Sequence, residues 1–198
     1  LKGPVFCLAR ACAGSNHAMG LAFQLIRGGA ADVMLCGGAE AMISFGGLKA
    51  WEGLRVMSPT GCRPFRADRD GMVMGEGAAV FVFEEYERAR DRGADILAEV
   101  AGFGMTADAA DIVLPSPEGA AHAMRAALRD AGLQPSDIGY INAHGTGTAA
   151  NDRSESQAIR EVFGDAPPPV SSTKSMHGHV MGATGAIELL ACLMALRD

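Results

Sequence analysis

The sequence predicts an α/β fold in which strands alternate with helices. Short apolar runs, such as residues 78–84 (AAVFVFE), have the length and composition of buried strands. Between such runs lie longer segments with apolar residues three or four positions apart, as in residues 118–131, a spacing typical of amphipathic helices. Because strands that alternate with helices usually join a parallel sheet, we expect a mostly parallel sheet covered by helices.

The individual elements follow from these two patterns in chain order. Strands are expected at residues 5–9, 32–36, 78–84, 96–103 and 138–143. Helices are expected at residues 12–27, 118–131, 152–163 and 182–196, and a short charged helix should end near Arg92. Gly37 and Gly38 are expected to close the second strand. The first and last helices are apolar nearly all round, which predicts burial on every side.

Length and composition limit the class of protein. The 198 residues suffice for one domain with a sizeable core, and 48% hydrophobic with 20% charged residues describes a soluble globular chain. The net charge of -6 without a basic stripe argues against a nucleic-acid partner. The longest purely apolar run, residues 189–196, is too short to span a bilayer. Since the chain begins without Met and ends in an expected helix, we interpret it as a piece of a longer protein.

The cysteines indicate a reducing compartment. The chain has five of them, an odd number, scattered and without a Cys-x-x-Cys pair, which argues against a disulfide framework and a zinc ribbon. No signal peptide, transit peptide or lipidation motif is recognisable. We therefore expect a cytoplasmic location.

Cys12, within ACAGSN, is the first candidate for chemistry. It follows an expected strand and opens an expected helix, a placement that exposes the side chain and puts its sulfur near the positive helix end. Such an environment favours the nucleophilic thiolate. The alternative is that a cysteine is a small buried hydrophobe, which we favour for Cys7, Cys36 and Cys192, while Cys62 is expected in a loop.

Several histidines and one lysine are further candidates. His144 ends an expected strand in INAHGTGT, a usual place for a catalytic side chain, although its ring could instead satisfy loop backbone. His177 and His179 form HGH, a weak zinc signal without placed carboxylates. Lys174 either sets the charge state of these histidines or is a solvated loop residue. Ordinary helix residues are expected at His17 and His122. The glycine-rich runs match neither the P-loop nor the dinucleotide pattern, so nucleotide binding is not expected.

Three motifs in this order resemble the β-ketoacyl-ACP synthases of the thiolase-like superfamily, over nearly the whole chain. GPVFCLARACAGSNHA resembles the nucleophile segment with Cys12, and INAHGTGT carries the first active-site histidine, His144. STKSMHGHVMGATGAIE assigns Lys174 and the second active-site histidine, His179, and CRPFRADRDGMVMGEGAAVFVFEE is a further family feature. The resemblance implies a thiolase-like layered αβαβα sandwich. Residues 1–198 would form a single partial ketosynthase domain without its N-terminal part and C-terminal end.

Details of these motifs resemble the discrete elongating synthases of type II systems. Asn151 and Asp152 follow GTGTAA, where modular polyketide enzymes usually carry Gly-Asp-Pro. Two active-site histidines argue against the initiating synthases, which pair one histidine with an asparagine. The presence of Cys12 argues against a chain-length factor, in which the nucleophile is replaced. Thiolases use a second cysteine as base, and none is suitably placed here.

The resemblance implies a decarboxylative Claisen condensation that lengthens a fatty acid or polyketide by two carbons. Cys12 would carry the acyl chain, while His144 and His179 would donate hydrogen bonds to the enolate formed from a malonyl thioester. Lys174 would pair with Glu188 and organise the two histidines. No redox cofactor or catalytic metal is implied, because the partner acyl carrier protein brings its own phosphopantetheine.

The resemblance also assigns supporting residues and partners. Asp152 and Glu155 would belong to the network behind the histidines, and Thr146 and Thr148 would line the malonyl end of the substrate tunnel. The family implies a homodimer.

An acidic carrier protein needs a basic patch on an acidic synthase. Arg63 matches a family position that contacts the carrier, and Arg66 and Arg69 are expected to reinforce it. The alternative is that these arginines are simply solvated.

The chain departs from the family pattern at several positions. Arg10 stands where Thr or Ser is usual, and a cation there could favour the thiolate or disturb the packing. Arg66 stands where the family has an Asp, and Asp111 stands where a His is common. Val113 stands where elongating enzymes often carry a Thr that faces the malonyl pocket. We expect these changes to bear on substrate preference. The C-terminal Gly-Phe-Gly-Gly loop is absent, so we expect the fragment alone to be inactive.

Two alternative functions stay open. A papain-like cysteine peptidase would space Cys12 and His144 similarly, but its characteristic cysteine motif is absent and Trp51 lies far from Cys12 in the sequence. A non-catalytic ketosynthase-like partner subunit is the other alternative. The intact set of Cys12, His144 and His179 argues against it, while Arg10 keeps it possible.

Overall fold

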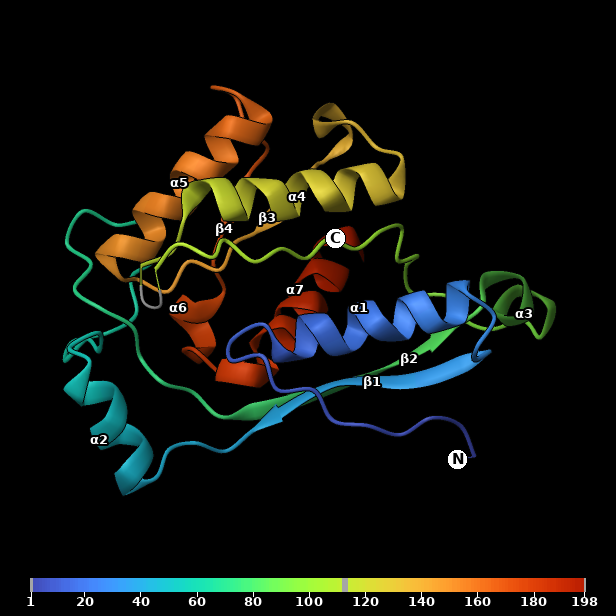
Figure 1. Ribbon diagram of the computed structural model, residues 1–198, viewed down its shortest axis with the longest axis horizontal. Helices are drawn as coiled ribbons and strands as arrows, with labels where there is room; N and C mark the ends of the chain where they lie inside the picture. Colours follow the sequence, from blue (N-terminus) through green and yellow to red (C-terminus); the bar gives the residue numbers. More distant parts are fainter. Residues whose placement is uncertain (1, 112–113, 198) are drawn as a thin grey trace. The chain divides into compact units, whose positions relative to one another are not determined.

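The computed structural model describes residues 2–111 and 114–197, and these residues form two compact units. The first unit combines residues up to 41, residues 77–101 and residues from 180 onward; the second combines residues 42–76 and 102–179. Elements of the first unit are α1 (Gly14–Arg27), β1 (Val33–Glu40), β2 (Gly77–Glu84), α3 (Tyr86–Asp91), the 3-10 turn η2 (Met181–Ala183) and α7 (Thr184–Arg197) (Figure 1). Elements of the second unit are α2 (Phe45–Gly53), α4 (Pro117–Ala131), η1 (Pro135–Asp137), β3 (Ile141–Asn142), α5 (Ala149–Phe163), β4 (Val170–Ser171) and α6 (Lys174–His177).

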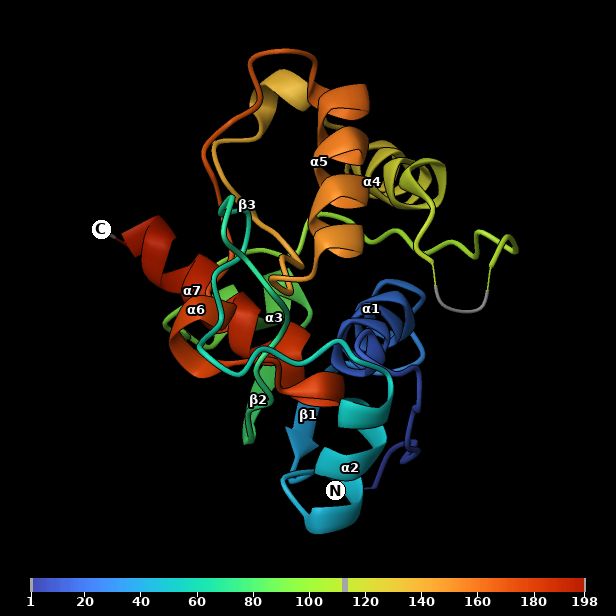
Figure 2. The same cartoon turned by 90° about the vertical axis from the view of Figure 1, so that its left-hand side faces the viewer.

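The first unit is built on the pair β1–β2. The two strands run antiparallel, from Val33 opposite Glu84 to Glu40 opposite Gly77. Figures 1 and 2 show α1 and α7 on the same face of this pair, and both helices contact it. The buried centre of the layer consists of Met19, Ala22, Cys36 and Ala186, with Phe81 and Phe83 packed against it.

The expectation of a mostly parallel sheet is therefore wrong for the larger strand pair. The apolar composition of residues 78–84 favours a strand, and it does not specify the direction in which that strand pairs. In the second unit the expectation is confirmed on a small scale, because β3 and β4 pair in parallel, with Ile141 opposite Val170. The helix α5 lies between these strands in the chain and makes the crossover that parallel strands require.

Gly37 and Gly38 do not end a strand, contrary to the sequence prediction. They lie inside β1, which continues to Glu40. A Cβ atom on Gly38 would approach Ser15 Cβ to 2.9 Å and Ala183 Cα to 3.0 Å, so only glycine allows α1 and η2 to pack this closely on the strand. The glycines thus mark close packing, a role that a turn-like dipeptide does not reveal.

Two expected strands are absent from the described residues. Residues 5–9 and 96–103 form no ladder there, and Val5 is 86% exposed. A strand requires a neighbour to hydrogen-bond with, so apolar composition is not sufficient. Gly104 instead passes along α4, where an added Cβ would lie 2.3 Å from the carbonyl oxygen of Ala123.

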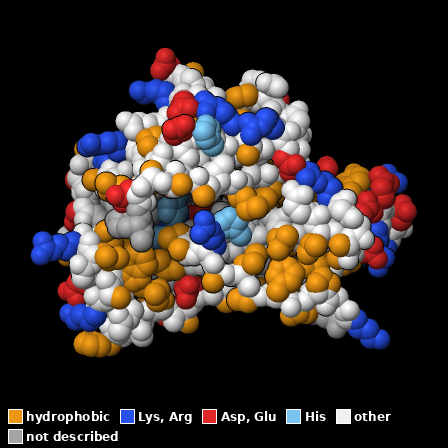
Figure 3. Space-filling model, viewed as in Figure 1, with side chains coloured by type: hydrophobic (Ala, Val, Ile, Leu, Met, Phe, Trp, Pro, Cys, Tyr) orange, Lys and Arg blue, Asp and Glu red, His pale blue; other side chains and the backbone are white. Residues whose placement is uncertain are grey.

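The predicted helices are confirmed within a few residues. Ser116 caps α4 by accepting a hydrogen bond from the Gly119 N–H, and Gly132 ends that helix in the left-handed conformation. The short charged helix is α3, and charged side chains gather at this end of the molecule (Figure 3). Glu84 accepts there from Arg92 at 2.7 Å. Sequence reasoning missed α2 and α6, which are short and rich in glycine or serine.

The prediction that the last helix is buried on every side is wrong. The first turns of α7 bury Thr184, Ala186 and Glu188, but Leu190, Met194 and Leu196 are exposed. Apolar composition shows that a surface can be buried, whereas burial itself requires a neighbour in the fold.

Among the described helices, none is both long and apolar enough for a membrane span.

We predict that Gly38→Ala destabilises the protein by about 1–3 kcal/mol, because the new methyl group overpacks the contact with Ser15 and Ala183. Urea unfolding followed by circular dichroism measures the effect. The matched control is Gly46→Ala, since nothing lies within 4 Å of a Cβ at Gly46 on α2. Equal unfolding midpoints for the two variants would contradict this account of the packing.

Candidate active site

The second unit brings two chain segments together at the ends of its parallel strands. Asn142 pairs with Ser171, and the Ala143 N–H donates to the carbonyl of Ser171 at 2.8 Å. His144 follows the end of β3 by two residues, and Ser172 is the first residue after β4. Because parallel strands end at the same edge, both strand ends lie side by side, as is usual for sites in α/β folds.

His144 and His179 form an edge-to-face pair in this unit. Their ring centroids lie 5.2 Å apart with an interplanar angle of 86°. The backbone of His179 is held by the segment before β2: its N–H donates to Val73 at 2.7 Å and its carbonyl accepts from Gly75 at 2.9 Å. Two histidines that lie 35 positions apart in the sequence are thus placed together by backbone hydrogen bonds.

Burial holds both imidazoles in the neutral form. The pKa of His144 lies well below the usual 6.5, first because the ring is desolvated and then because Lys174 and His179 repel its charge. The pKa of His179 falls to about 3, again through burial first and Lys174 second. Each neutral ring therefore carries one N–H donor and one acceptor nitrogen at neutral pH.

Lys174 is fully buried, so the alternative of a solvated loop residue is wrong. Its ammonium group donates to the carbonyl of His144. It lies at the start of α6, which places it between β4 and His179 in the chain. His177, one turn later, pairs its Nε2 with the Thr173 hydroxyl at 3.0 Å.

Two carboxylates of α5 hold the loop that follows β3. Glu155 accepts hydrogen bonds from the N–H groups of His144 at 2.6 Å and Gly145 at 2.7 Å. Burial raises the pKa of this carboxyl group, and the two hydrogen bonds lower it by a smaller amount. Asp152 is buried and accepts from Phe65 N–H at 2.8 Å, and from the Gly147 N–H at 3.2 Å. Both therefore act on backbone next to the first histidine, which is consistent with the supporting role expected of them.

The two threonines of this loop contact each other. The hydroxyl oxygens of Thr146 and Thr148 are 2.8 Å apart, and Thr148 caps α5 by accepting from the Asn151 N–H. Capping satisfies a helix N–H that would otherwise lack a partner. That the two side chains line a substrate tunnel stays a prediction.

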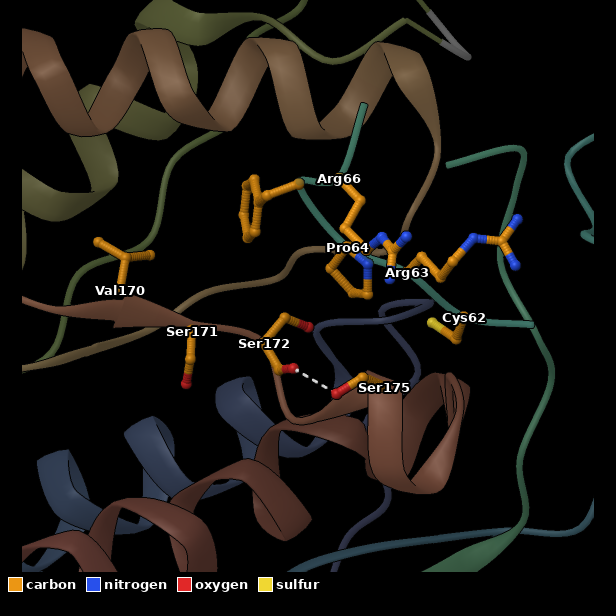
Figure 4. Close-up of a pocket in the computed structure, with 9 residues that line it drawn as sticks. Cys62, Arg63, Pro64, Arg66, Val170, Ser171, Ser172 and Ser175 are labelled. Carbon is orange, nitrogen blue, oxygen red and sulfur yellow. Dashed lines mark hydrogen bonds between the residues drawn. The ribbon is translucent and has the colours of Figure 1, made fainter. Parts of the chain in front are cut away.

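A cavity of about 410 Å³ lies beside the end of β4, lined by residues 62–66, 170–172 and Ser175. Figure 4 shows the segment with Arg63 and Arg66 on one side and Ser172 and Ser175 on the other. Cys62 lies in this loop, as expected, and burial raises the pKa of its thiol.

The three arginines expected to dock a carrier protein differ in exposure. Arg63 is largely covered and binds Asp70 at 2.9 Å, and Arg69 lies 3.3 Å from the buried Asp152. Arg66 is the exposed one, with 66% of its side chain accessible and a contact to Asp68 at 2.8 Å. Docking by these residues stays a prediction, and the geometry favours Arg66 for it.

Cys12 lies in the first unit, two residues before α1. Ala11 precedes it with φ at 45°, a left-handed conformation that costs a residue with a side chain about 1–3 kcal/mol. The turn is closed by hydrogen bonds from Ala13 to Arg10 and from Gly14 to Ala11. Arg10 itself is exposed. The predicted turn into a helix is confirmed, although no strand precedes it among residues 2–11.

The other cysteines divide by burial. Cys36 is buried and its thiol pKa rises to about 12, as expected of an inert core residue. Cys7 is exposed, so its predicted burial is wrong; the segment around it lacks a strand partner among the described residues. Cys192 is half-buried on α7, where Glu188 is buried as well. The pairing of Glu188 with Lys174 stays a prediction.

Of the positions that depart from the family pattern, Asp111 accepts a hydrogen bond from the Leu114 N–H at 2.8 Å. Val113 lies outside the described residues.

Ser172 was missed by sequence reasoning: its hydroxyl donates to the carbonyl of Gly145 at 2.7 Å. The sequence feature that could have identified it is its position two residues before Lys174 in STKS. A serine close to a candidate lysine is too common to be singled out on that ground.

Comparison with known proteins gives matches along almost the whole chain. Residues 1–89 match the beta-ketoacyl synthase N-terminal domain, and residues 97–198 match the beta-ketoacyl synthase C-terminal domain. Nodulation protein E of Rhizobium leguminosarum bv. trifolii is 56% identical over 200 residues, which cover 100% of this chain and 50% of that protein. The 3-oxoacyl-[acyl-carrier-protein] synthase 2 of Staphylococcus aureus is 45% identical over 206 residues, covering 100% and 51%. The chain thus spans about half the length of these curated relatives.

A solved complex is similar in structure. It contains AntDE, a ketosynthase bound to the hexaketide, with AntF, its type II polyketide acyl-carrier protein. The TM-score is 0.93 at 38% identity, and the match covers 96% of this chain and 50% of that one. Ketosynthases of this kind act with acyl carrier protein. The sequence motifs, the mixed α/β fold and these matches agree: the chain belongs to the beta-ketoacyl synthase family.

Proposed function

We propose that the complete protein containing this chain is a 3-oxoacyl-[acyl-carrier-protein] synthase. It condenses an acyl chain on Cys12 with a malonyl group on acyl carrier protein and lengthens a fatty acid or polyketide by two carbons. The observation that carries the proposal is the pair of neutral histidines, His144 and His179, with ring centroids 5.2 Å apart. Family membership and the identity with a synthase of that name support it.

The first step is acyl transfer to Cys12. Its thiolate attacks the carbonyl carbon of an acyl thioester, and the phosphopantetheine thiolate of the carrier leaves. Cys12 lies two residues before α1, and the positive end of a helix generally favours a nearby thiolate. The backbone N–H of Cys12 stabilises the charge on the carbonyl oxygen.

The second step forms and uses the carbon nucleophile. The bond between the malonyl carboxylate and its α-carbon breaks, carbon dioxide leaves, and the electron pair remains as an enolate. His144 and His179 donate hydrogen bonds to the enolate oxygen. The α-carbon then attacks the acyl carbonyl on Cys12, the thiolate leaves, and 3-oxoacyl carrier protein is formed.

The charge state of the histidines matters in this step. A neutral imidazole stabilises an enolate by donating a hydrogen bond, whereas an imidazolium would transfer its proton and quench the carbanion. Burial lowers the pKa of both rings, and the nearby ammonium group of Lys174 lowers it further. Pairing of Lys174 with Glu188 would balance that cation.

The remaining parts of the proposal follow the family. Residues 1–198 belong to one ketosynthase domain of a cytoplasmic homodimer, Thr146 and Thr148 contact the malonyl group, and Arg66 contributes to carrier docking. The rival role of a non-catalytic partner subunit would need the same fold with an unreactive Cys12.

Acyl loading tests the nucleophile. The protein at its full encoded length should gain one acyl group on Cys12 from acyl carrier protein, and Cys12→Ala should abolish the mass increase. Cys7→Ala is the matched control, since Cys7 is exposed in the same unit and should not affect loading. A folded protein that takes no acyl group would identify a partner subunit instead.

The histidines should act after loading. We expect His144→Ala and His179→Ala to lower the condensation rate by about 10²–10³-fold, the usual cost of removing one oxyanion donor, while Cys12 still accepts the acyl group. Single-turnover assays with malonyl carrier protein separate the two steps. Variants that condense at the wild-type rate would remove the histidines from the mechanism.

The lowered histidine pKa values also predict a pH-dependent stability. Between the folded pKa (about 3 for His179) and the unfolded value near 6.5, unfolding takes up protons, so stability falls as the pH drops below about 6.5. The expected slope approaches about 1 kcal/mol per pH unit for each histidine. Urea unfolding between pH 7.5 and 5 measures how the free energy of unfolding changes with pH. In a His144→Gln/His179→Gln double variant, the part of this slope that the two histidines contribute should be absent. An unchanged slope would show that the rings titrate normally in the folded protein.

A further inference from the structure

Ser172 links the two chain segments that carry the histidine pair. It is the first residue after β4, and the pairing of Asn142 with Ser171 places it beside the chain that leaves β3. Its side chain is buried, with 9% of the residue exposed. Its hydroxyl donates to the carbonyl of Gly145 at 2.7 Å and lies 3.4 Å from the Lys174 N–H.

Side chains satisfy all four polar backbone groups of the dipeptide His144–Gly145. Glu155 accepts from both N–H groups, at 2.6 and 2.7 Å. Lys174 donates to the carbonyl of His144, and Ser172 donates to that of Gly145. A loop held this way cannot rotate a peptide plane without losing a buried hydrogen bond.

Ser172 also restricts this loop sterically. Gly145 has a positive φ of 39°, and a Cβ atom there would lie 2.4 Å from Ser172 Cβ and 2.9 Å from the ring of Phe65. The serine side chain therefore lies directly against the Gly145 backbone. Movement of that backbone toward Ser172 is blocked, and movement away from it stretches the hydrogen bond.

We propose that Ser172 is a positioning residue for the condensation: its hydroxyl holds the carbonyl of Gly145 and thereby fixes the ring of His144 against that of His179. This inference rests on the proposed function. Acyl transfer to Cys12 does not depend on the position of His144 in the mechanism above, so loss of the hydroxyl acts on the later step. A displacement of a catalytic group by about 1 Å can cost about 100-fold in rate.

The test compares Ser172→Ala with Ser171→Ala in the protein at its full encoded length. Ser171 is the adjacent serine, exposed, and its hydroxyl pairs with Tyr140 at 2.7 Å, so it is a matched control. We expect Ser172→Ala to lower the condensation kcat at least 10-fold, with acyl loading and the KM for malonyl carrier protein changed less than twofold. Ser171→Ala should behave like the wild type.

A conservative variant separates the hydroxyl from mere packing. Ser172→Thr keeps the hydroxyl donor on the same Cβ atom. It should restore most of the rate. If Ser172→Ala fails to fold, Ser172→Cys fills the same space with a weaker donor and takes its place. Unchanged condensation in Ser172→Ala, or an equal fall in loading, condensation and Tm, would overturn the inference.

A second readout does not depend on activity. With [13Cε1]histidine labelling, the NMR signal of His144 should shift in Ser172→Ala and stay in place in Ser171→Ala. If the wild type neither loads nor condenses, the proposed function fails, and this signal still decides the role of Ser172. An unmoved His144 signal would overturn the inference even in an active enzyme.

Discussion

The buried ammonium group of Lys174 is the charge around which the second unit is organised. A cation out of contact with water is costly unless polar groups surround it, and here the carbonyl of His144 accepts a hydrogen bond from it. The same charge lowers the pKa of both histidines and opposes the rise in pKa that burial imposes on Glu155. One buried lysine therefore acts on the backbone of the first histidine and on the protonation of both.

Around this charge, rigidity comes from side chains that bind backbone. Glu155 and Asp152 project from one helix, α5, and receive N–H groups from the loop that follows β3. Ser172 holds the opposite side of the same loop. Such an arrangement holds the loop that carries His144 without the mobility that loops usually have.

In the first unit, packing holds the start of α1, which follows Cys12, the proposed nucleophile. Gly38 lets α1 approach the strand, and the Ser15 hydroxyl accepts from the Ala186 N–H of α7 at 3.1 Å. These contacts hold the first turn of α1, and with it the left-handed residue Ala11 just before Cys12. Packing inside the unit thus maintains a conformation that the local sequence alone would avoid.

Sequence patterns alone predicted the longer helices and the chemistry-bearing motifs, because both depend on short stretches of chain. Apolar spacing predicts α1, α4, α5 and α7, and the motifs around Cys12, His144 and His179 identify the family. Strand pairing depends on the tertiary structure: the apolar runs at 32–36 and 78–84 do not specify antiparallel pairing, and residues 5–9 and 96–103 lack strand partners in the described part of the chain. The same holds for two hydrogen bonds, from Lys174 to the carbonyl of His144 and from Ser172 to the carbonyl of Gly145. They join residues 30 and 27 positions apart. Such contacts depend on how strands align in space, and no local pattern encodes that alignment.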